Sequence, residues 1–113
     1  MKIGILTFTD GRKRVAEATK DDCMRFQKEI ADWFQIEGHE VVAFGNTVWN
    51  YESARGGARY LHSEGCDIAV FNFCVWSFPD LTMQAAILVN CPILCVGNIN
   101  PSHPGWVAFF ASA

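Results

Sequence analysis

Residues 67–73 read DIAVFNF, a near-continuous apolar run that follows Gly65. A strand that is apolar on both of its faces is typical of a parallel sheet with helices packed on either side. The sequence therefore predicts a central, fully covered β-strand at this position and an α/β fold around it.

Strand-like and helix-like segments alternate on both sides of this run. Short apolar segments over residues 2–8, 40–44 and 92–96 predict three more strands. Apolar spacing of three and four predicts helices over residues 14–37 and 51–61, and Pro79 and Pro104 suit the first turns of two later helices. This alternation predicts one α/β domain over residues 1–113, a flavodoxin-like three-layer parallel sheet with strand order 2-1-3-4 and right-handed crossovers.

Helical spacing also predicts which side chains of the helices face the sheet. The inner face of the third helix is expected to carry Met83, Ala86 and Ile87. The long first helix is expected to bury a stripe made of Val15, Ala18, Cys23, Phe26, Ile30, Trp33 and Phe34.

The last predicted helix contains Trp106, Phe109 and Phe110, and the chain stops inside it. These aromatic side chains need something to cover them, and a five-stranded version of the fold would continue with another strand and helix. We therefore expect the chain to be the amino-terminal part of a longer, multidomain protein, and the isolated 113 residues to self-associate through the exposed apolar patch.

Composition excludes several classes of protein. Half of the 113 residues are hydrophobic and 19% are charged, which excludes wholesale disorder. A net charge of -3 and a pI near 5.5 argue against general nucleic-acid binding. No apolar run approaches the ~20 residues that span a bilayer, and the amino terminus lacks the pattern of a secretory signal, so we expect a cytoplasmic protein without a membrane partner.

The cysteines and histidines form no recognisable metal or disulfide pattern. Five cysteines are an odd number and include no CxxC pair, so reduced, buried thiols are expected. The three histidines lie far apart along the chain, and each is expected to be a surface or loop residue.

Four loops follow the predicted strands, and in open α/β sheets ligands bind at that edge. The loops span residues 7–13, 44–50, 72–78 and 97–105. They contain most of the unusual side chains, namely Asp10, Arg12, Trp49, Asn72, Trp76, Asn98, Asn100 and His103.

The loop after the first strand allows two interpretations. Hydroxyl groups and a helix amino terminus would suit a phosphate. However, Asp10 places a carboxylate there, and the sequence contains neither GxGxxG nor GxxxxGK[ST]. The alternative, which we favour, is that Asp10 caps the following helix while Arg12 pairs with a nearby carboxylate.

Trp76 follows the central strand almost directly and also has two possible roles. It could fill a core gap or cover a subunit contact. Otherwise it is presented at the strand end as a flat apolar platform, on which a sugar ring could stack. No nucleophile and base occur in a catalytic pattern, so the residues alone predict a ligand-facing edge without a complete active site.

Several of these segments, taken with the layout, resemble the amino-terminal domain of the L-fucose isomerase family, which includes D-arabinose isomerases. The matching segments are residues 2–4 leading to Asp-Gly-Arg at 10–12, the long helix through Met24, the tryptophan loop at 74–76, and residues 92–94 ending in Gly97. The likeness extends over essentially all of the chain.

The resemblance implies a hexameric, manganese-dependent aldose–ketose isomerase built from three domains, which moves a proton between C1 and C2 of an open-chain sugar through an ene-diol. The metal ligands and the acidic catalytic residues come from later domains of such enzymes, so no catalytic residue, metal ligand or cofactor is expected in this chain. The amino-terminal domain makes oligomer contacts and lends a tryptophan to a neighbouring sugar site. Trp76 matches that position and Arg12 is a second, weaker candidate for sugar binding, while residues 77–80 depart from the fucose isomerase pattern.

The sequence thus predicts the amino-terminal substrate-recognition and assembly domain of an aldose–ketose sugar isomerase. Two alternatives stay open at this point. One is a flavodoxin-like module that binds a flavin or a nucleotide, and the other is a purely structural oligomerisation domain.

Overall fold

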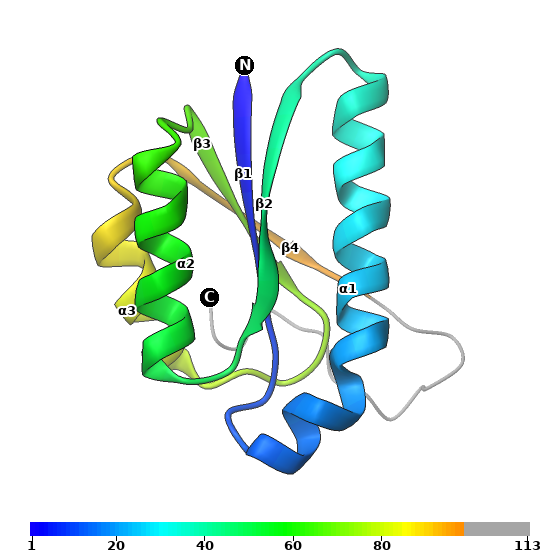
Figure 1. Ribbon diagram of the computed structural model, residues 1–113, viewed down its shortest axis with the longest axis vertical. Coiled ribbons are helices and arrows are strands. Elements are labelled where there is room, and N and C mark those ends of the chain that lie inside the picture. Colours follow the sequence, from blue (N-terminus) through cyan, green and yellow to red (C-terminus); the bar gives the residue numbers. More distant parts are fainter. Residues whose placement is uncertain (99–113) are drawn as a thin grey trace.

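A computed structural model describes residues 1–98 of the chain as a parallel sheet between two layers of helices (Figure 1). The elements are β1 (Lys2–Phe8), α1 (Lys13–Ile36), β2 (Glu40–Val48), α2 (Tyr51–Ser63), β3 (Ile68–Phe73), α3 (Pro79–Val89) and β4 (Ile93–Gly97). The strand order is β2-β1-β3-β4 and every neighbouring pair is parallel, which confirms the predicted three-layer α/β arrangement. The helix predicted from Pro104, with Trp106, Phe109 and Phe110, lies outside the described residues.

Each face of the sheet has its own core. On one face, α2 and α3 cover a large cluster in which the ring of Phe8 stacks on that of Phe73 with centroids 5.0 Å apart. On the other face, α1 packs on a smaller cluster that includes Ile5 and Val70. The middle strands β1 and β3 are therefore buried on both sides, as the apolar run at 67–73 predicts.

β2 is longer than predicted because it contains a bulge. Ile5 of β1 pairs with Ala43, and Thr7 pairs with Thr47, so residues 44–46 lie opposite Leu6 alone. A bulge bends a strand and changes where its side chains point. Here β2 continues past the bulge to Val48, and Asn46 within the bulge lines cavities on both the α1 and the α2 side.

The helix faces differ in part from the prediction. Met83 and Ile87 of α3 are 63% and 70% exposed, and the buried residues of that helix are Leu81, Thr82, Ala85 and Val89. Because α3 is apolar at most positions, its periodicity could not select the inner face. In α1, Cys23 and Phe26 are buried as predicted, but Trp33 is 59% exposed.

The glycines inside α2 have different surroundings. A Cβ atom on Gly57 would lie 2.8 Å from Leu6 Cδ2, so only glycine permits this close approach of helix and sheet. A Cβ atom on Gly56 would meet nothing within 4 Å. Across residues 1–98, none of the helices combines the length and apolar character that crossing a bilayer requires.

Candidate functional site

The loops that follow β1, β2 and β3 meet at one edge of the sheet (Figure 1). This follows from the parallel register, in which Phe8 at the end of β1 pairs with Val48 on one side and with Phe73 on the other. Arg12 and Trp76 therefore belong to adjacent loops.

Asp10 and Arg12 form a two-pronged ion pair at this edge. Asp10 is 2% exposed. Its Oδ1 accepts hydrogen bonds from the backbone N–H and the Nε of Arg12 at 2.8 and 2.9 Å, and its Oδ2 accepts one from Nη2 at 2.6 Å. These hydrogen bonds lower the pKa of Asp10 and raise the pKa of Arg12, so both groups stay charged.

The pair bears on both interpretations of the first loop. The prediction that Arg12 pairs with a nearby carboxylate is confirmed. The prediction that Asp10 caps α1 is wrong, because the N-cap residue of α1 is Arg12 and no side chain caps the first turn of this helix. A phosphate at this point would face the charge of Asp10, which also engages Nε and Nη2 of Arg12.

Trp76 projects from an anchored loop. Its neighbours Val75 and Ser77 are 6% and 1% exposed, whereas Trp76 itself is 43% exposed. Buried flanks hold the backbone in place, so the indole presents a face at low cost in conformational entropy.

Gly11 joins the two candidate loops. A Cβ atom at Gly11 would lie 2.5 Å from Cδ2 of the Phe78 ring, so the first loop can rest on Phe78 only because residue 11 is glycine. Phe78 follows Trp76 by two residues, and Arg12 follows Gly11 directly. The structure thus brings the loops together, although no cation–π pair between Arg12 and Trp76 is present among the described residues.

A network of hydrogen bonds between buried amides and hydroxyls lies beneath these loops, at the ends of β1 and β3. Thr7 Oγ1 donates to Gln27 Oε1 at 2.6 Å and accepts from Asn72 Nδ2 at 3.1 Å. Asn98 Nδ2 donates to Asn72 Oδ1 and to the carbonyl of Phe73. Sequence reasoning singled out Asn72 and Asn98 and counted Thr7 among the loop hydroxyls, but it missed Gln27. The available signal was a glutamine at an inward position of α1, four residues after Cys23.

Two cysteines meet beneath the Trp76 loop. Cys23 of α1 and Cys74 are both fully buried, and the Cys74 thiol donates weakly to the carbonyl of Cys23. The contact between the two thiols lowers the pKa of Cys23, and the same contact, together with burial, raises the pKa of Cys74. All five cysteines lie within residues 1–98 and none forms a disulfide, as predicted, but Cys66, Cys91 and Cys95 are only partly buried.

Metal binding requires a cluster of ligand side chains. Within residues 1–98, no three His, Cys, Asp or Glu side chains lie close enough together to hold an ion. The manganese that the resemblance implies therefore does not fit a site in the described part of the chain.

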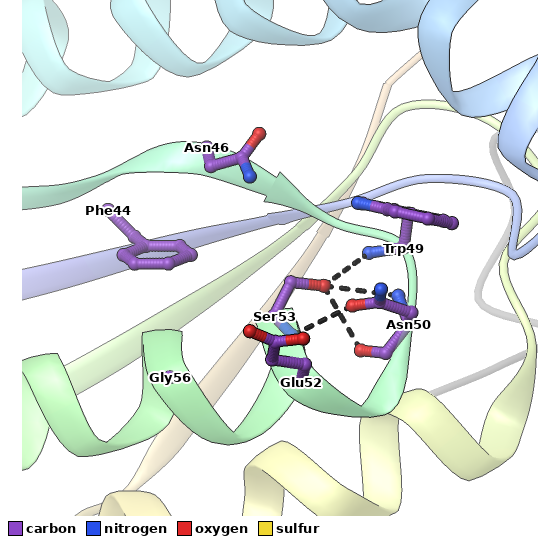
Figure 2. A pocket seen from close by; sticks show the side chains of 7 residues that line it. All are labelled: Phe44, Asn46, Trp49, Asn50, Glu52, Ser53 and Gly56. Atoms are coloured by element: carbon purple, nitrogen blue, oxygen red, sulfur yellow. Dashed lines mark hydrogen bonds between the residues drawn. The ribbon is translucent and has the colours of Figure 1, made fainter.

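A cavity of about 400 Å³ opens between the end of β2 and α2 (Figure 2). Its walls include Trp49 and Asn46 from the β2 side and Glu52 and Gly56 from α2. Trp49 also lines two smaller cavities, one toward α1 and one toward Phe78. The sequence marked Trp49 as an unusual loop residue and gave it no role.

Comparison with known families gives one match over the whole chain. The model of the family described as L-fucose isomerase, first N-terminal domain, matches residues 1–113. No curated protein and no solved structure matches this chain.

Proposed function

This chain belongs to the family of first N-terminal domains of L-fucose isomerase, and we propose that it is the substrate-recognition and assembly domain of an aldose–ketose sugar isomerase. One observation supports the recognition role most strongly. An exposed tryptophan stands on a rigid loop that Gly11 and Phe78 join to the loop bearing Arg12.

Trp76 would bind the apolar C–H face of a sugar. An indole excludes water from that face without competing for the hydroxyl groups. Covering ~60–80 Å² of apolar surface at ~25 cal/mol per Å² contributes roughly 1.5–2 kcal/mol. That is sufficient for a measurable effect on substrate capture and too little to bind a sugar alone.

Arg12 would add a polar contact of fixed direction. Asp10 engages its Nε and Nη2 groups, so the guanidinium is already oriented, and its Nη1 group would donate to a sugar hydroxyl. The proton shift between C1 and C2 is assigned to groups outside residues 1–98, where the complete enzyme would also hold its manganese ion.

The assembly role rests on α3. Met83 and Ile87 lie on the side of α3 opposite its buried residues, and both are mostly exposed. Apolar side chains in such a position favour association with a second protein surface. We propose that this face takes part in a homo-oligomer, a hexamer in the complete enzyme, and the same observation favours a purely structural oligomerisation domain as the second candidate function.

A flavin or nucleotide module is less well supported. Both phosphate-bearing ligands need an anion site, and the buried carboxylate of Asp10 stands in the loop that would provide it. We therefore prefer a neutral sugar as the ligand at this edge.

Steady-state kinetics of the complete enzyme would test the proposal. Trp76→Ala should lower kcat/KM by about tenfold to thirtyfold, since each 1.4 kcal/mol is a factor of ten. Manganese affinity, measured separately, should not change. A matched control is Trp33→Ala, because Trp33 is also exposed but lies near the carboxyl end of α1, at the opposite edge of the sheet (Figure 1). A change in kcat/KM of less than twofold for Trp76→Ala would leave the oligomerisation domain as the better account.

A further inference from the structure

The cavity beside Trp49 is separate from the Trp76 loop and has the size of a small-molecule site. Its volume of about 400 Å³ lies within the range of ~300–1,000 Å³ that such sites occupy. Figure 2 shows Asn46 and Trp49 on the side of β2, with Glu52 and Gly56 on α2 across from them.

The bulge in β2 shapes one wall. Residues 44–46 lie opposite Leu6 alone, and Asn46, the last of them, lines the cavity. Its Oδ1 accepts the backbone N–H of Thr47 at 2.9 Å, which orients the amide and leaves Nδ2 as a hydrogen-bond donor. Bulges are over-represented next to functional sites, where they can change the direction of a side chain.

The backbone of Trp49 is held by the first turn of α2. Its N–H donates to Ser53 Oγ at 3.0 Å, and Ser53 also forms a reciprocal capping box with Asn50. The indole is therefore attached to an ordered segment, and it is only partly buried. A ligand would find this aromatic face already in place.

Gly56 forms part of the opposite wall of the cavity, and the stability of α2 does not explain why this position is a glycine. A glycine within a helix costs about 1 kcal/mol relative to alanine. Close packing explains this cost at Gly57, where a Cβ atom would meet Leu6, but a Cβ atom on Gly56 would meet no atom within 4 Å. The missing side chain at Gly56 instead keeps the cavity open.

The charges around the cavity select the class of ligand. Glu52 is the one ionisable side chain among the lining residues, so anionic ligands are disfavoured. An indole face with an amide donor and a carboxylate acceptor suits a ring that has C–H groups on one side and hydroxyls at its edge. We propose that this cavity is a binding site for a neutral polyhydroxylated ligand of monosaccharide size, distinct from the site at Trp76 and independent of it.

Nuclear magnetic resonance of the full 113-residue chain would test this site. L-Fucose and D-arabinose are the probes, and the readouts are the indole N–H signal of Trp49 and the side-chain amide signal of Asn46. We expect both signals to shift in a saturable way. In Gly56→Gln, whose side chain would fill the cavity, the apparent Kd should rise at least tenfold, and Arg59→Gln, on an exposed position of the same helix, should leave it unchanged.

Two further variants keep the result decisive. Gly56→Ala should raise the midpoint of thermal unfolding, because alanine favours the helix, and it should still weaken the sugar-dependent shifts. Trp76→Ala should leave the shifts of Trp49 and Asn46 intact, even if the sugar role of Trp76 is wrong.

Several outcomes would overturn the proposal. One is that neither sugar moves the signals of Trp49 and Asn46. Another is that Trp76→Ala removes the shifts, since the two sites would then not be separate. A third is that tetramethylammonium chloride, a cation that could sit between Glu52 and the indole, binds at Trp49 while the sugars do not.

Discussion

The ion pair of Asp10 and Arg12 has a direct consequence for stability. Asp10→Asn removes the charge but keeps the size of a buried side chain that accepts three hydrogen bonds. We expect a loss of roughly 1–2 kcal/mol in the free energy of unfolding at neutral pH. Urea denaturation of both proteins would measure it.

The same pair predicts a pH dependence. The pKa of Asp10 in the folded state lies below its unfolded value of about 3.9. Its stabilising effect is therefore complete above pH ~4 and is lost as the pH falls through the folded pKa. The difference in stability between the native protein and Asp10→Asn should accordingly shrink on acidification, and a constant difference down to pH ~2 would contradict this assignment.

Gly11 offers a second test at the level of single residues. Gly11→Ala would place a methyl group 2.5 Å from the Phe78 ring and force the two loops apart. We expect a cost of about 1–3 kcal/mol, as for other overpacked sites, and weaker sugar capture by the complete enzyme. Gly45→Ala is the control, because its Cβ atom would meet nothing within 4 Å, and an equal effect of both changes would show that loop contact is not the cause.

The sequence predicted contacts at this edge that are local in the chain, but not those between residues far apart in the sequence. The pairing of Arg12 involves residues two positions apart, which a local pattern can indicate. The bond between Thr7 and Gln27 joins a strand to a helix twenty residues later, and nothing in local spacing specifies that contact. The wall at Trp49 depends on the bulge in β2, which periodicity does not indicate either.

Among the elements, α3 shows where helical periodicity stops being informative. Apolar residues occupy most of Pro79–Val89, so several faces look equally suitable for the core. The structure buries the face with Leu81 and Ala85, which packs against the sheet and α2, and leaves Met83 and Ile87 outside. In α1, charged residues such as Lys28 and Glu29 mark the outer face. Even so, Ala18 and Trp33 of the predicted inner stripe are exposed.

The outward face of α3 gives a prediction for assembly. The double variant Met83→Lys and Ile87→Lys should weaken self-association of the chain, measured by sedimentation velocity, because charged side chains oppose burial in an interface. The free energy of unfolding should change by less than about 0.5 kcal/mol per substitution, as at other exposed positions. Leu81→Ala, at a buried position of the same helix, should instead cost about 2–5 kcal/mol. Unchanged association of the double variant would place the interface elsewhere.

For the whole molecule, the alternation of strands and helices predicted a parallel sheet covered on both faces, and the flavodoxin-like pattern supplied the strand order, which the structure confirms. The order β2-β1-β3-β4 is that of the flavodoxin-like pattern, and right-handed crossovers then place α1 on one face of the sheet and α2 and α3 on the other. The same topology brings the loops of β1, β2 and β3 to one edge, where open α/β sheets bind their ligands, so the fold alone predicts where to look for a site.

Neither Arg12 nor Asp10 is suited to the acid–base work that an aldose–ketose shift requires at the proposed sugar site. A base must move a proton between C1 and C2, and a positive group must stabilise the oxygen that gains charge. Arg12 cannot act as a base because a guanidinium stays protonated at neutral pH. The carboxylate of Asp10, whose pKa is lowered, is already engaged by Arg12. Cys23 and Cys74 are fully buried, beyond the reach of a sugar at the surface.

We therefore expect recognition without turnover in the 113-residue chain. Incubation with L-fucose or D-arabinose and manganese should form no ketose, while L-fucose should still perturb the indole N–H signal of Trp76 at high concentration. Chromatographic analysis of the sugars would follow the first result and nuclear magnetic resonance the second, with the complete enzyme as the positive control for turnover. Manganese-dependent ketose formation by this chain alone would contradict the proposal that it recognises the sugar while groups elsewhere carry out the proton shift. Within residues 1–98, no side-chain cluster suited to the ion exists.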